Sequence, residues 1–312
     1  MNQHSHSIYA LLLLSTVLWG GQPTVLKGLI QEMSPVLIPV YRYVIIGGIL
    51  FAILLIRDRA IPIPTKKQAY ILAAMGLSGI TLNNTLQFTG LQYSTAINCS
   101  IVSSTTPALT AVLAAVFLRE RMNVIQWLGI TISLCGVIFL VTRGSLDIIR
   151  TLSFNYGDLL FFASQISWAV YTVLSLKIVF DLSPMATTAW AGLAGAVMTG
   201  IYALWTGIDM TPTLTSGGML GLSYMSIGGG VLAMTWWNKG VQVVGPSTAS
   251  LFFNVVPIAG MISAALFVGE ELGWNEIMAA LWILGGIYLS TQGYKHFQGL
   301  AKKSKPAESS LS

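Results

Sequence analysis

Charged side chains are scarce in this sequence, since Asp, Glu, Lys and Arg together make up 9% of its 312 residues. An ordinary soluble domain has roughly a quarter of its residues charged. Hydrophobic residues account for 54% of the chain, and its mean hydropathy is +0.73. A fold with so few charges cannot cover its surface with polar groups, so this composition excludes a soluble globular protein.

The sequence also lacks segments of about ten alternating polar and apolar residues, which form the strands of membrane barrels. Its apolar runs are instead close to the ~20 residues that a helix needs to cross a bilayer. The predicted spans cover residues 8–27, 35–56, 68–90, 94–118, 124–142, 155–177, 184–206, 215–238, 245–268 and 275–294. Because a helix satisfies its own backbone groups in lipid, we predict an all-α integral membrane protein with ten transmembrane helices.

Lys and Arg are nearly absent from one set of loops. If the N-terminus lies inside, the inner loops and the tail contain twelve of them and the outer loops contain three, Lys27, Arg143 and Arg150. Because positive residues concentrate on the cytoplasmic side of membrane proteins, we predict cytoplasmic N- and C-termini in a multi-pass protein of a bacterial plasma membrane. The pI of 9.2 follows from this bias. We therefore expect membrane lipid as a partner and no nucleic acid.

The predicted spans lack the residue groups that catalyse reactions or bind metals. The three histidines, His4, His6 and His296, lie outside the spans, and Cys99 and Cys135 lie in separate spans. There is no HExxH, no GxSxG and no carboxylate pair within a predicted span. We therefore predict a protein that is not an enzyme and binds no cofactor and no metal. A membrane-embedded enzyme that acts on lipids is the remote alternative.

The second half of the chain repeats the first half. A shift of 150 residues matches Gly90, Gln92, Pro107, Phe117, Glu120 and Gly136 with Gly240, Gln242, Pro257, Phe267, Glu270 and Gly286. A shift of 149 residues matches Ser15, Trp19, Ser34 and Pro35 with Ser164, Trp168, Ser183 and Pro184. We predict a first five-helix repeat over residues 1–142, a linker over 143–154, a second repeat over 155–294 and a basic polar tail over 295–312.

Each repeat contains five predicted spans, which is an odd number. The first repeat therefore ends on the side opposite to its start, and the second repeat enters the membrane inverted. The loop charges agree, because LRERM between the fourth and fifth spans becomes VGEEL in the second copy, without either arginine. Many secondary transporters are built from inverted repeats that enclose one site near the middle of the membrane.

Two tryptophans occupy equivalent positions near the middle of the first and sixth spans. Side chains at i, i+4 and i+7 share one helix face, so Trp19 shares a face with Ser15 and Gln22. Trp168 likewise shares a face with Tyr171. A position in the core or against lipid is the alternative for either tryptophan, but the polar neighbours of both favour one shared substrate cavity.

Further candidates for the cavity lie on the third, eighth and ninth spans. Asn84 and Gln87 are one turn apart on the third span, and Trp237 stands in place of Gln87 in the second copy. Asn254 lies on the ninth span. The alternative role for these amides is to join helices, because amides in a membrane form hydrogen bonds between helices.

Prolines interrupt the fourth and ninth spans. Pro107 and Pro257 lie near the span centres, where each removes a backbone hydrogen bond and frees the carbonyl four residues earlier, at Ser103 and Phe253. A bend that serves only helix packing is the alternative. We predict that both prolines kink their helices, flank the site and take part in gating.

Three charged residues are candidates for function. No Asp or Glu falls at the centre of a predicted span, since Asp158 opens the sixth span, and this disfavours proton-driven export of organic cations. Arg42 lies about 10 Å into the second span. It either has a structural role, by snorkelling to the surface or pairing with Asp158, or it binds a substrate carboxylate. Lys27 ends the first span, where we consider it as a gate charge.

Five segments carry a resemblance to a known family. They are LWGGQP at 18–23, VYRYVI at 40–45, GLQYSTAINCSIVSSTTPALTAVLAAVFLRER at 90–121, GDLLFFASQISWAVY at 157–171 and GVQVVGPSTASLFFNVVPIAGMISAALFVGEEL at 240–272. Together they resemble the ten-helix EamA branch of the drug/metabolite transporter superfamily, over residues 8–294. The resemblance implies export of amino acids, related metabolites or drugs through a cavity lined by helices one, three, four, six, eight and nine.

Aromatic rings together with scattered amides and hydroxyls suit an uncharged or zwitterionic molecule with an apolar part. We predict a secondary transporter that exports a small neutral or zwitterionic metabolite, an amino acid with an aromatic or large apolar side chain, by alternating access. A multidrug or toxic organic-cation exporter is the alternative, since aromatic walls also attract cations. We expect this small-molecule substrate as the partner of a monomer or weak homo-oligomer.

Overall fold

The computed structural model describes residues 3–94, 102–119, 122–142, 144–151, 155–178, 181–268 and 273–293. In these ranges the chain forms helices and loops without any strand. Six helices are long and apolar enough to cross a membrane, namely Ser7–Glu32, Leu37–Asp58, Val124–Thr142, Tyr156–Ile178, Pro184–Trp205 and Ser216–Val244. Two shorter apolar helices cover Thr106–Leu118 and Ile277–Thr291. The predicted all-α class is confirmed for the described residues, and these helices are those of a membrane protein.

The described helices follow the predicted spans along the chain. Those of the first half are α1 (Gln3–Gly20), α2 (Gln22–Glu32), α3 (Leu37–Asp58), α4 (Lys66–Met75), η1 (Gly76–Leu82), α5 (Asn83–Tyr93), α7 (Thr106–Leu118), α8 (Val124–Thr142) and α9 (Leu146–Thr151). Those of the second half are α10 (Tyr156–Ile178), α11 (Pro184–Trp205), α12 (Ser216–Ser226), η2 (Ile227–Leu232), α13 (Ala233–Val244), α14 (Pro246–Leu251), η3 (Phe252–Asn254), α15 (Val255–Val268), α16 (Trp274–Tyr288) and η4 (Leu289–Gly293). Side-chain hydroxyls of Thr65, Ser183 and Thr215 accept backbone N–H groups where α4, α11 and α12 begin, which satisfies donors that have no partner inside the helix.

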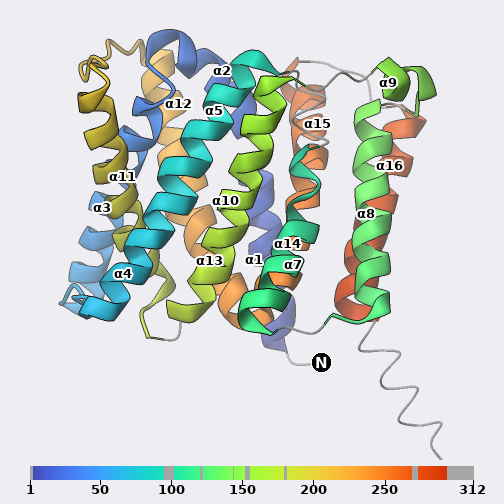
Figure 1. Ribbon diagram of the computed structural model, residues 1–312, viewed down its shortest axis with the longest axis horizontal. Coiled ribbons are helices and arrows are strands. Elements are labelled where there is room, and N and C mark those ends of the chain that lie inside the picture. Colours follow the sequence, from blue (N-terminus) through green and yellow to red (C-terminus); the bar gives the residue numbers. More distant parts are fainter. Residues whose placement is uncertain are drawn as a thin grey trace, which may run out of the picture.

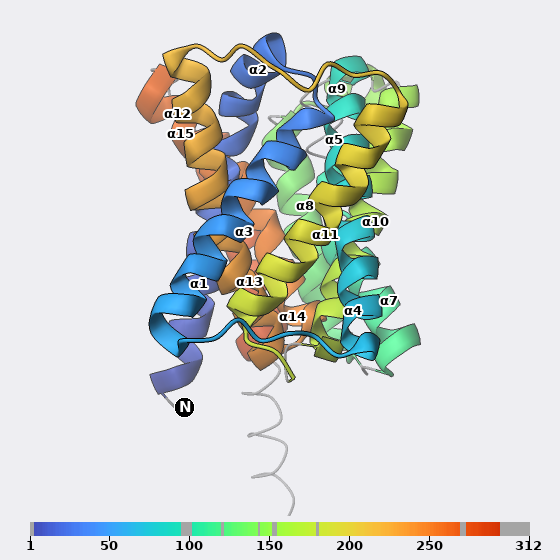
Figure 2. The same ribbon diagram turned by 90° about the vertical axis from the view of Figure 1, so that its left-hand side faces the viewer.

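The helices form a bundle in which the two halves of the chain pack against each other (Figure 1). The most extensive contacts join α3 with α11, α8 with α16, α5 with α10 and α1 with α13. Each of these pairs combines one helix of the first half with one helix of the second. Figure 2 shows α3 and α11 lying next to each other on one side of the bundle. In Figure 1, α1 runs upward from the N-terminus, whereas α10, its counterpart in the second half, runs downward.

Small residues bring α8 and α16 into backbone contact at one edge of the bundle. A Cβ atom added to Gly286 of α16 would lie 2.5 Å from the carbonyl oxygen of Gly129 and 2.6 Å from the backbone nitrogen of Ser133, both in α8. A Cβ atom added to Gly136 of α8 would lie 2.9 Å from the backbone nitrogen of Ile283 in α16. In lipid, helices associate through such close packing because there is little hydrophobic effect between them. The repeat therefore supplies a glycine, Gly136 or Gly286, to each side of this contact.

Several predicted spans are not continuous α-helices. The third and eighth spans contain the π-helical segments η1 and η2, at nearly equivalent positions of the 150-residue shift. At Gly21 the regular hydrogen bonding of the helix Ser7–Glu32 is interrupted, which divides it into α1 and α2. Helices broken at corresponding places in two halves are typical of the binding sites of transporters.

Over residues 94–118 and 245–268 the described residues form helices that are interrupted just before the prolines. α7 begins at Thr106 and contains Pro107 in its first turn. Proline costs little there because the N–H groups of a first turn have no partner within the helix. The ninth span is divided into α14, η3 and α15, with Pro257 in the first turn of α15. Both prolines therefore lie where a new helix begins, and their role in gating stays a prediction.

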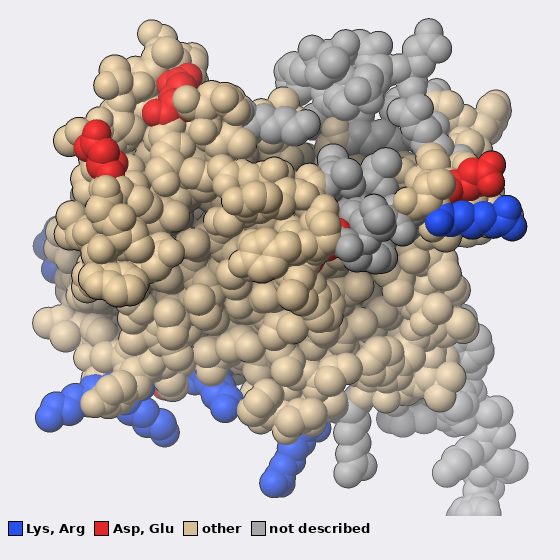
Figure 3. Space-filling model, turned by 45° about the horizontal axis from the view of Figure 1, so that its top comes forward, with Lys and Arg blue, Asp and Glu red and all other residues tan. Residues whose placement is uncertain are grey.

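Charged side chains gather toward the two ends of the bundle (Figure 3). Blue Lys and Arg side chains lie along the lower edge of this view, and red Asp and Glu side chains lie higher. At the lower end, the last turn of α3, its connection to α4 and the first turn of α4 contain Arg57, Arg59, Lys66 and Lys67. Arg150, near the other end, pairs with Asp147 at 3.7 Å. The separation of charge follows the loop pattern that the sequence predicts.

Candidate functional site

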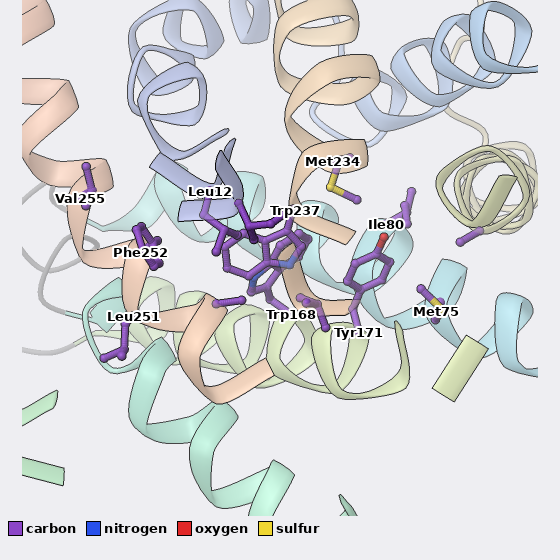
Figure 4. Close-up of a cluster of buried hydrophobic side chains, with 14 of the residues drawn as sticks. Leu12, Met75, Ile80, Trp168, Tyr171, Met234, Trp237, Leu251, Phe252 and Val255 are labelled. Carbon is purple, nitrogen blue, oxygen red and sulfur yellow. The ribbon is translucent and has the colours of Figure 1, made fainter. Parts of the chain in front are cut away.

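Five aromatic side chains from both halves of the chain meet inside the bundle, and we call them the aromatic cluster. They are Trp19 of α1, Trp168 and Tyr171 of α10, Trp237 of α13 and Phe253 of η3. Figure 4 shows Trp168, Tyr171 and Trp237 close together among buried apolar side chains. The structure thus brings together four residues that the sequence proposes for one site, and it adds Phe253.

The rings of the aromatic cluster pack directly against one another. Trp19 meets Trp168 edge to face with ring centroids 5.5 Å apart, and Trp168 stacks on Tyr171 at 5.0 Å. Trp237 and Tyr171 have no exposed surface. Each such ring pair contributes about 0.5–1.5 kcal/mol beyond the burial of its area. The rings fill the space between the helices in this conformation, so a ligand must separate them to bind there.

The indole N–H groups of the aromatic cluster differ in their partners. Trp19 Nε1 donates to the carbonyl oxygen of Gly229 in η2 at 2.9 Å. In the described part of the chain, the buried Nε1 atoms of Trp168 and Trp237 have no hydrogen-bond partner. Leaving a buried donor unpaired costs about 1–3 kcal/mol. A ligand that places an oxygen atom beside Trp168 or Trp237 would recover this free energy.

Tyr171 joins the aromatic cluster to a buried amide. Asn238 of α13 has no exposed surface, and its Nδ2 donates to the Tyr171 hydroxyl and to Thr188 Oγ1 of α11, each at 2.9 Å. Because the three residues come from three helices, this network fixes the orientation of the Tyr171 ring. The sequence did not predict the network. The position of Asn238 directly after Trp237, inside a span, is the feature that could have indicated it, since an amide in a membrane needs a partner.

Arg42, Gln22 and Asn84 form a second group, which we call the polar cluster. Arg42 lies in α3 and is 4% exposed. Its guanidinium donates to Gln22 Oε1 at 3.4 Å, to Asn84 Oδ1 at 3.5 Å and to the carbonyl oxygen of Met225 at 3.2 Å. Arg42 therefore lies inside the bundle, and the interpretation that it snorkels to the surface is wrong.

Asp158 is not a partner of Arg42 among the described contacts. It lies in the first turn of α10, where its carboxylate accepts the backbone N–H of Asn155 at 2.6 Å and the hydroxyl of Ser94. A carboxylate in this position caps the helix and is favoured by the helix dipole. The interpretation that Arg42 and Asp158 form a structural pair is therefore wrong as well.

Gly229 connects the polar cluster to the aromatic cluster. Its carbonyl oxygen accepts the Trp19 N–H, and a Cβ atom added to it would overlap Gln22 Nε2 and lie 3.5 Å from a terminal nitrogen of Arg42. Only a glycine lets the backbone of η2 approach the two clusters this closely. A small ligand bound next to Gly229 could therefore contact both clusters.

The same kind of contact occurs a second time between the two halves. Gly79 of η1 corresponds to Gly229 of η2 in the 150-residue shift. A Cβ atom added to Gly79 would overlap the ring of Tyr171, and Tyr171 corresponds to Gln22 in the 149-residue shift. Each π-helical segment thus places a glycine against the equivalent residue of the opposite half.

Gln87, Asn254 and Lys27 are the remaining predicted site residues, and neither Gln87 nor Asn254 belongs to either cluster. Gln87 of α5 is half-buried and makes none of the contacts that define either cluster. Asn254 of η3 donates to Ser133 Oγ of α8 at 2.8 Å, so it joins helices as an amide in a membrane often does. The side chain of Lys27 lies outside the described residues.

A groove of about 470 Å³ lies between α2 and α12. Its lining residues are Thr24, Val25, Gly28, Leu29, Glu32, Gly217, Gly218, Leu220, Gly221 and Tyr224. From Gly217 to Tyr224 the groove follows α12 for about 10 Å, given the rise of a helix. Tyr224 precedes Met225, whose carbonyl oxygen accepts from Arg42 at 3.2 Å. The described lining of the groove contains no residue of the polar cluster.

Known proteins are similar to this chain over most of its length. Residues 6–142 and 155–292 match the EamA-like transporter family. The chain is 31% identical over 282 residues to the uncharacterized transporter YyaM of Bacillus subtilis (strain 168), covering 90% of this chain and 92% of that protein. It is 24% identical over 278 residues to the uncharacterized inner membrane transporter YedA of Escherichia coli (strain K12), covering 89% and 88%. A protein known from a crystal structure has the same fold, with a TM-score of 0.77 and 17% identity over 94% of this chain and 99% of its own.

Proposed function

This chain belongs to the EamA-like transporter family, and because it is a multi-pass membrane transporter of that family, we propose that it exports a small neutral or zwitterionic metabolite. The substrate class that we propose is an amino acid with an aromatic or large apolar side chain. The aromatic cluster is the observation that supports this most directly. Its rings offer apolar surface to such a side chain, and the unpaired N–H groups of Trp168 and Trp237 offer donors to a side-chain oxygen such as that of tyrosine.

We also propose that the chain crosses the membrane ten times as two inverted five-helix repeats, over residues 1–142 and 155–294, with both termini in the cytoplasm. The opposite directions of α1 and α10 support the inverted order (Figure 1). The lysines and arginines where α3 ends and α4 begins support a cytoplasmic position for that end of the bundle. One relative is named an inner membrane transporter, which supports the plasma membrane as the location.

Alternating access by rocking of the two halves is the mechanism that we propose. The packed rings of the aromatic cluster must separate to admit a substrate, and they come from both halves. Motion of one half against the other would separate them. The interrupted helices at η1, η2 and η3 surround these rings, and breaks in helices are places where bending costs little.

Transport by the purified protein in liposomes tests the proposal. We expect radiolabelled phenylalanine and leucine to move down their gradients faster than in protein-free liposomes, and aspartate to move no faster. A lipophilic organic cation, tetraphenylphosphonium, is the comparison probe. If the protein moves this cation and no amino acid, the proposed substrate class is wrong and the protein is a drug exporter.

A further inference from the structure

Arg42 carries a full positive charge into the interior of a membrane protein. Its side chain is 4% exposed, and a guanidinium does not lose its proton in proteins. Moving a charge out of water costs several kcal/mol unless a partner of opposite charge compensates it. Charged residues at such depth mark functional sites more often than they stabilise the fold.

No carboxylate compensates this charge among the described residues. The described salt bridges join Arg57 to Asp58 and Arg150 to Asp147, both at the ends of helices. The hydrogen-bond partners of Arg42 are two amide oxygens and one backbone carbonyl oxygen, and its guanidinium lies 5.7 Å from the centre of the Tyr43 ring, so all of its partners are neutral. The site around Arg42 therefore keeps a net positive charge until an anion binds.

The hydrogen bonds of Arg42 are long, and donors beside it are unused. Its distances to Gln22 and Asn84 are 3.4 and 3.5 Å, whereas a guanidinium and a carboxylate approach to about 2.7–2.9 Å. Arg42 Nε and Gln22 Nε2 are buried and have no partner in the described structure. A carboxylate could replace the weakly held neutral acceptors and use these donors.

We propose that Arg42, assisted by Gln22, binds the carboxylate of the transported substrate. This inference rests on the proposed transport of an amino acid and adds which end of the substrate lies where. Gly229 touches the polar cluster on one side and accepts from Trp19 of the aromatic cluster on the other. A substrate held by its carboxylate at Arg42 therefore presents its side chain to the aromatic cluster.

A purely structural role for Arg42 makes a different prediction. Its contacts join α3 to α2, α5 and α12, so a structural residue would lower stability and reduce the transport of every substrate alike. A carboxylate ligand instead changes the preference between two probes that differ only in the carboxylate. Selectivity is therefore the measurement that separates the two roles.

The first experiment compares L-phenylalanine with L-phenylalaninamide as competitors of labelled phenylalanine uptake into proteoliposomes. Hydrogen bonds to a charged group correspond to a preference of roughly 10- to 100-fold for the carboxylate in the wild type. In Arg42→Gln we expect the two probes to compete equally. Arg57→Gln is the matched control, because Arg57 lies on the same helix with 55% of its side chain exposed, and it should keep the wild-type preference. A preference retained in Arg42→Gln, or absent from the wild type, overturns the proposal.

Arg42→Lys addresses the case in which Arg42→Gln does not fold. Lysine keeps the charge but cannot offer two parallel donors to one carboxylate. We expect phenylalanine to bind several-fold more weakly in this variant and phenylalaninamide to bind as in the wild type. An equal loss for both probes indicates a structural role and overturns the proposal.

A second experiment does not depend on transport. Phenylacetate should raise the melting temperature of the purified wild type in detergent, whereas the neutral phenylacetamide should not, and Arg42→Lys should reduce the difference. If no amino acid is transported but phenylacetate stabilises the protein through Arg42, the proposed function fails and the carboxylate site stands. If amino acids are transported but phenylacetate has no effect beyond that of phenylacetamide, the carboxylate site fails.

Discussion

Trp19 and Gly229 are joined by a hydrogen bond of 2.9 Å, although 210 residues separate them in the chain. The bond runs from α1 in the first half to η2 in the second half, at the place where the aromatic and polar clusters meet. Any motion that moves the two halves apart at this level must break it. Whether this hydrogen bond is formed therefore depends on the relative position of the two halves.

Replacing Trp168 by phenylalanine should weaken substrate binding. The substitution keeps an aromatic ring and removes the indole N–H that has no partner in the described structure. We expect the half-saturation concentration for uptake of tyrosine, whose side-chain oxygen can accept this N–H, to rise roughly three- to tenfold, the value of one hydrogen bond. Trp127→Phe is the control, because Trp127 is 38% exposed on α8. Equal effects of the two substitutions would show that the N–H of Trp168 does not contact the substrate.

Replacing Tyr171 by phenylalanine should destabilise the protein. The change removes the acceptor of an Asn238 N–H at a site without solvent. An unpaired buried donor lowers the free energy of unfolding by about 1–3 kcal/mol. Unfolding of the purified variant in detergent, followed by circular dichroism, measures the loss. Tyr202→Phe should be neutral, since Tyr202 is 43% exposed; if it melts as early as Tyr171→Phe, the role assigned to Asn238 is wrong.

Replacing Gly79 or Gly229 by alanine should impair transport, because each of these glycines contacts a residue of the opposite half of the chain. Gly79→Ala would push the added Cβ into the buried ring of Tyr171, and Gly229→Ala would push it into the end of Gln22. We expect Gly79→Ala to lose stability and transport together, because the ring cannot move aside. In Gly229→Ala the flexible Gln22 amide can move, so transport should fall more than stability.

Gly228→Ala is the control for both glycines. Gly228 lies in η2 together with Gly229. The atom nearest to a Cβ added to Gly228 is 3.6 Å away, which is ordinary contact. Transport by this variant should match the wild type in the liposome assay. A defect as large as that of Gly229→Ala would attribute the effect to the segment itself and not to the contact with Gln22.

Replacing each of two neighbouring glycines of α16 by alanine should change the melting temperature in different directions. Gly286→Ala places its Cβ 2.5 Å from the carbonyl oxygen of Gly129 and must separate α8 from α16. Gly285→Ala meets nothing within 4 Å, and alanine is better than glycine in a helix by about 0.5–1 kcal/mol. Thermal unfolding in detergent should show a lower melting temperature for Gly286→Ala and an equal or higher one for Gly285→Ala. Similar melting of both variants would contradict the close packing of the two helices.

The meeting of Trp19 with Trp168 is the part of the candidate site that the sequence predicts best. The repeat assigns both residues the same place in their halves, and inverted halves that pack together bring equivalent places close to one another. The ring centroids are 5.5 Å apart. Whether these rings bind substrate stays a prediction.

Other features could not be predicted because they depend on how the helices turn against each other. The position of Arg42 along its span gives its depth, but only the packing of α3 against α11 and α12 turns it inward. Periodicity analysis assumes regular α-helices, and so it misses the turn at Gly21 and the short 3₁₀ segment η3. In η3, Phe253 faces the aromatic cluster while Asn254 bonds to α8.

The π-helical segment η2 has a consequence for the residues that follow it. A π-turn contains one residue more than an α-turn, and α13 continues directly from η2 with Trp237 and Asn238. If the surplus residue moved along α13, each residue that it passed would rotate by about 100° around the helix axis. Trp236 would then take the place that Trp237 has beside the other rings, while the helix kept nearly all of its backbone hydrogen bonds. The interior of the bundle could thus exchange one indole for its neighbour by a local change of helical register.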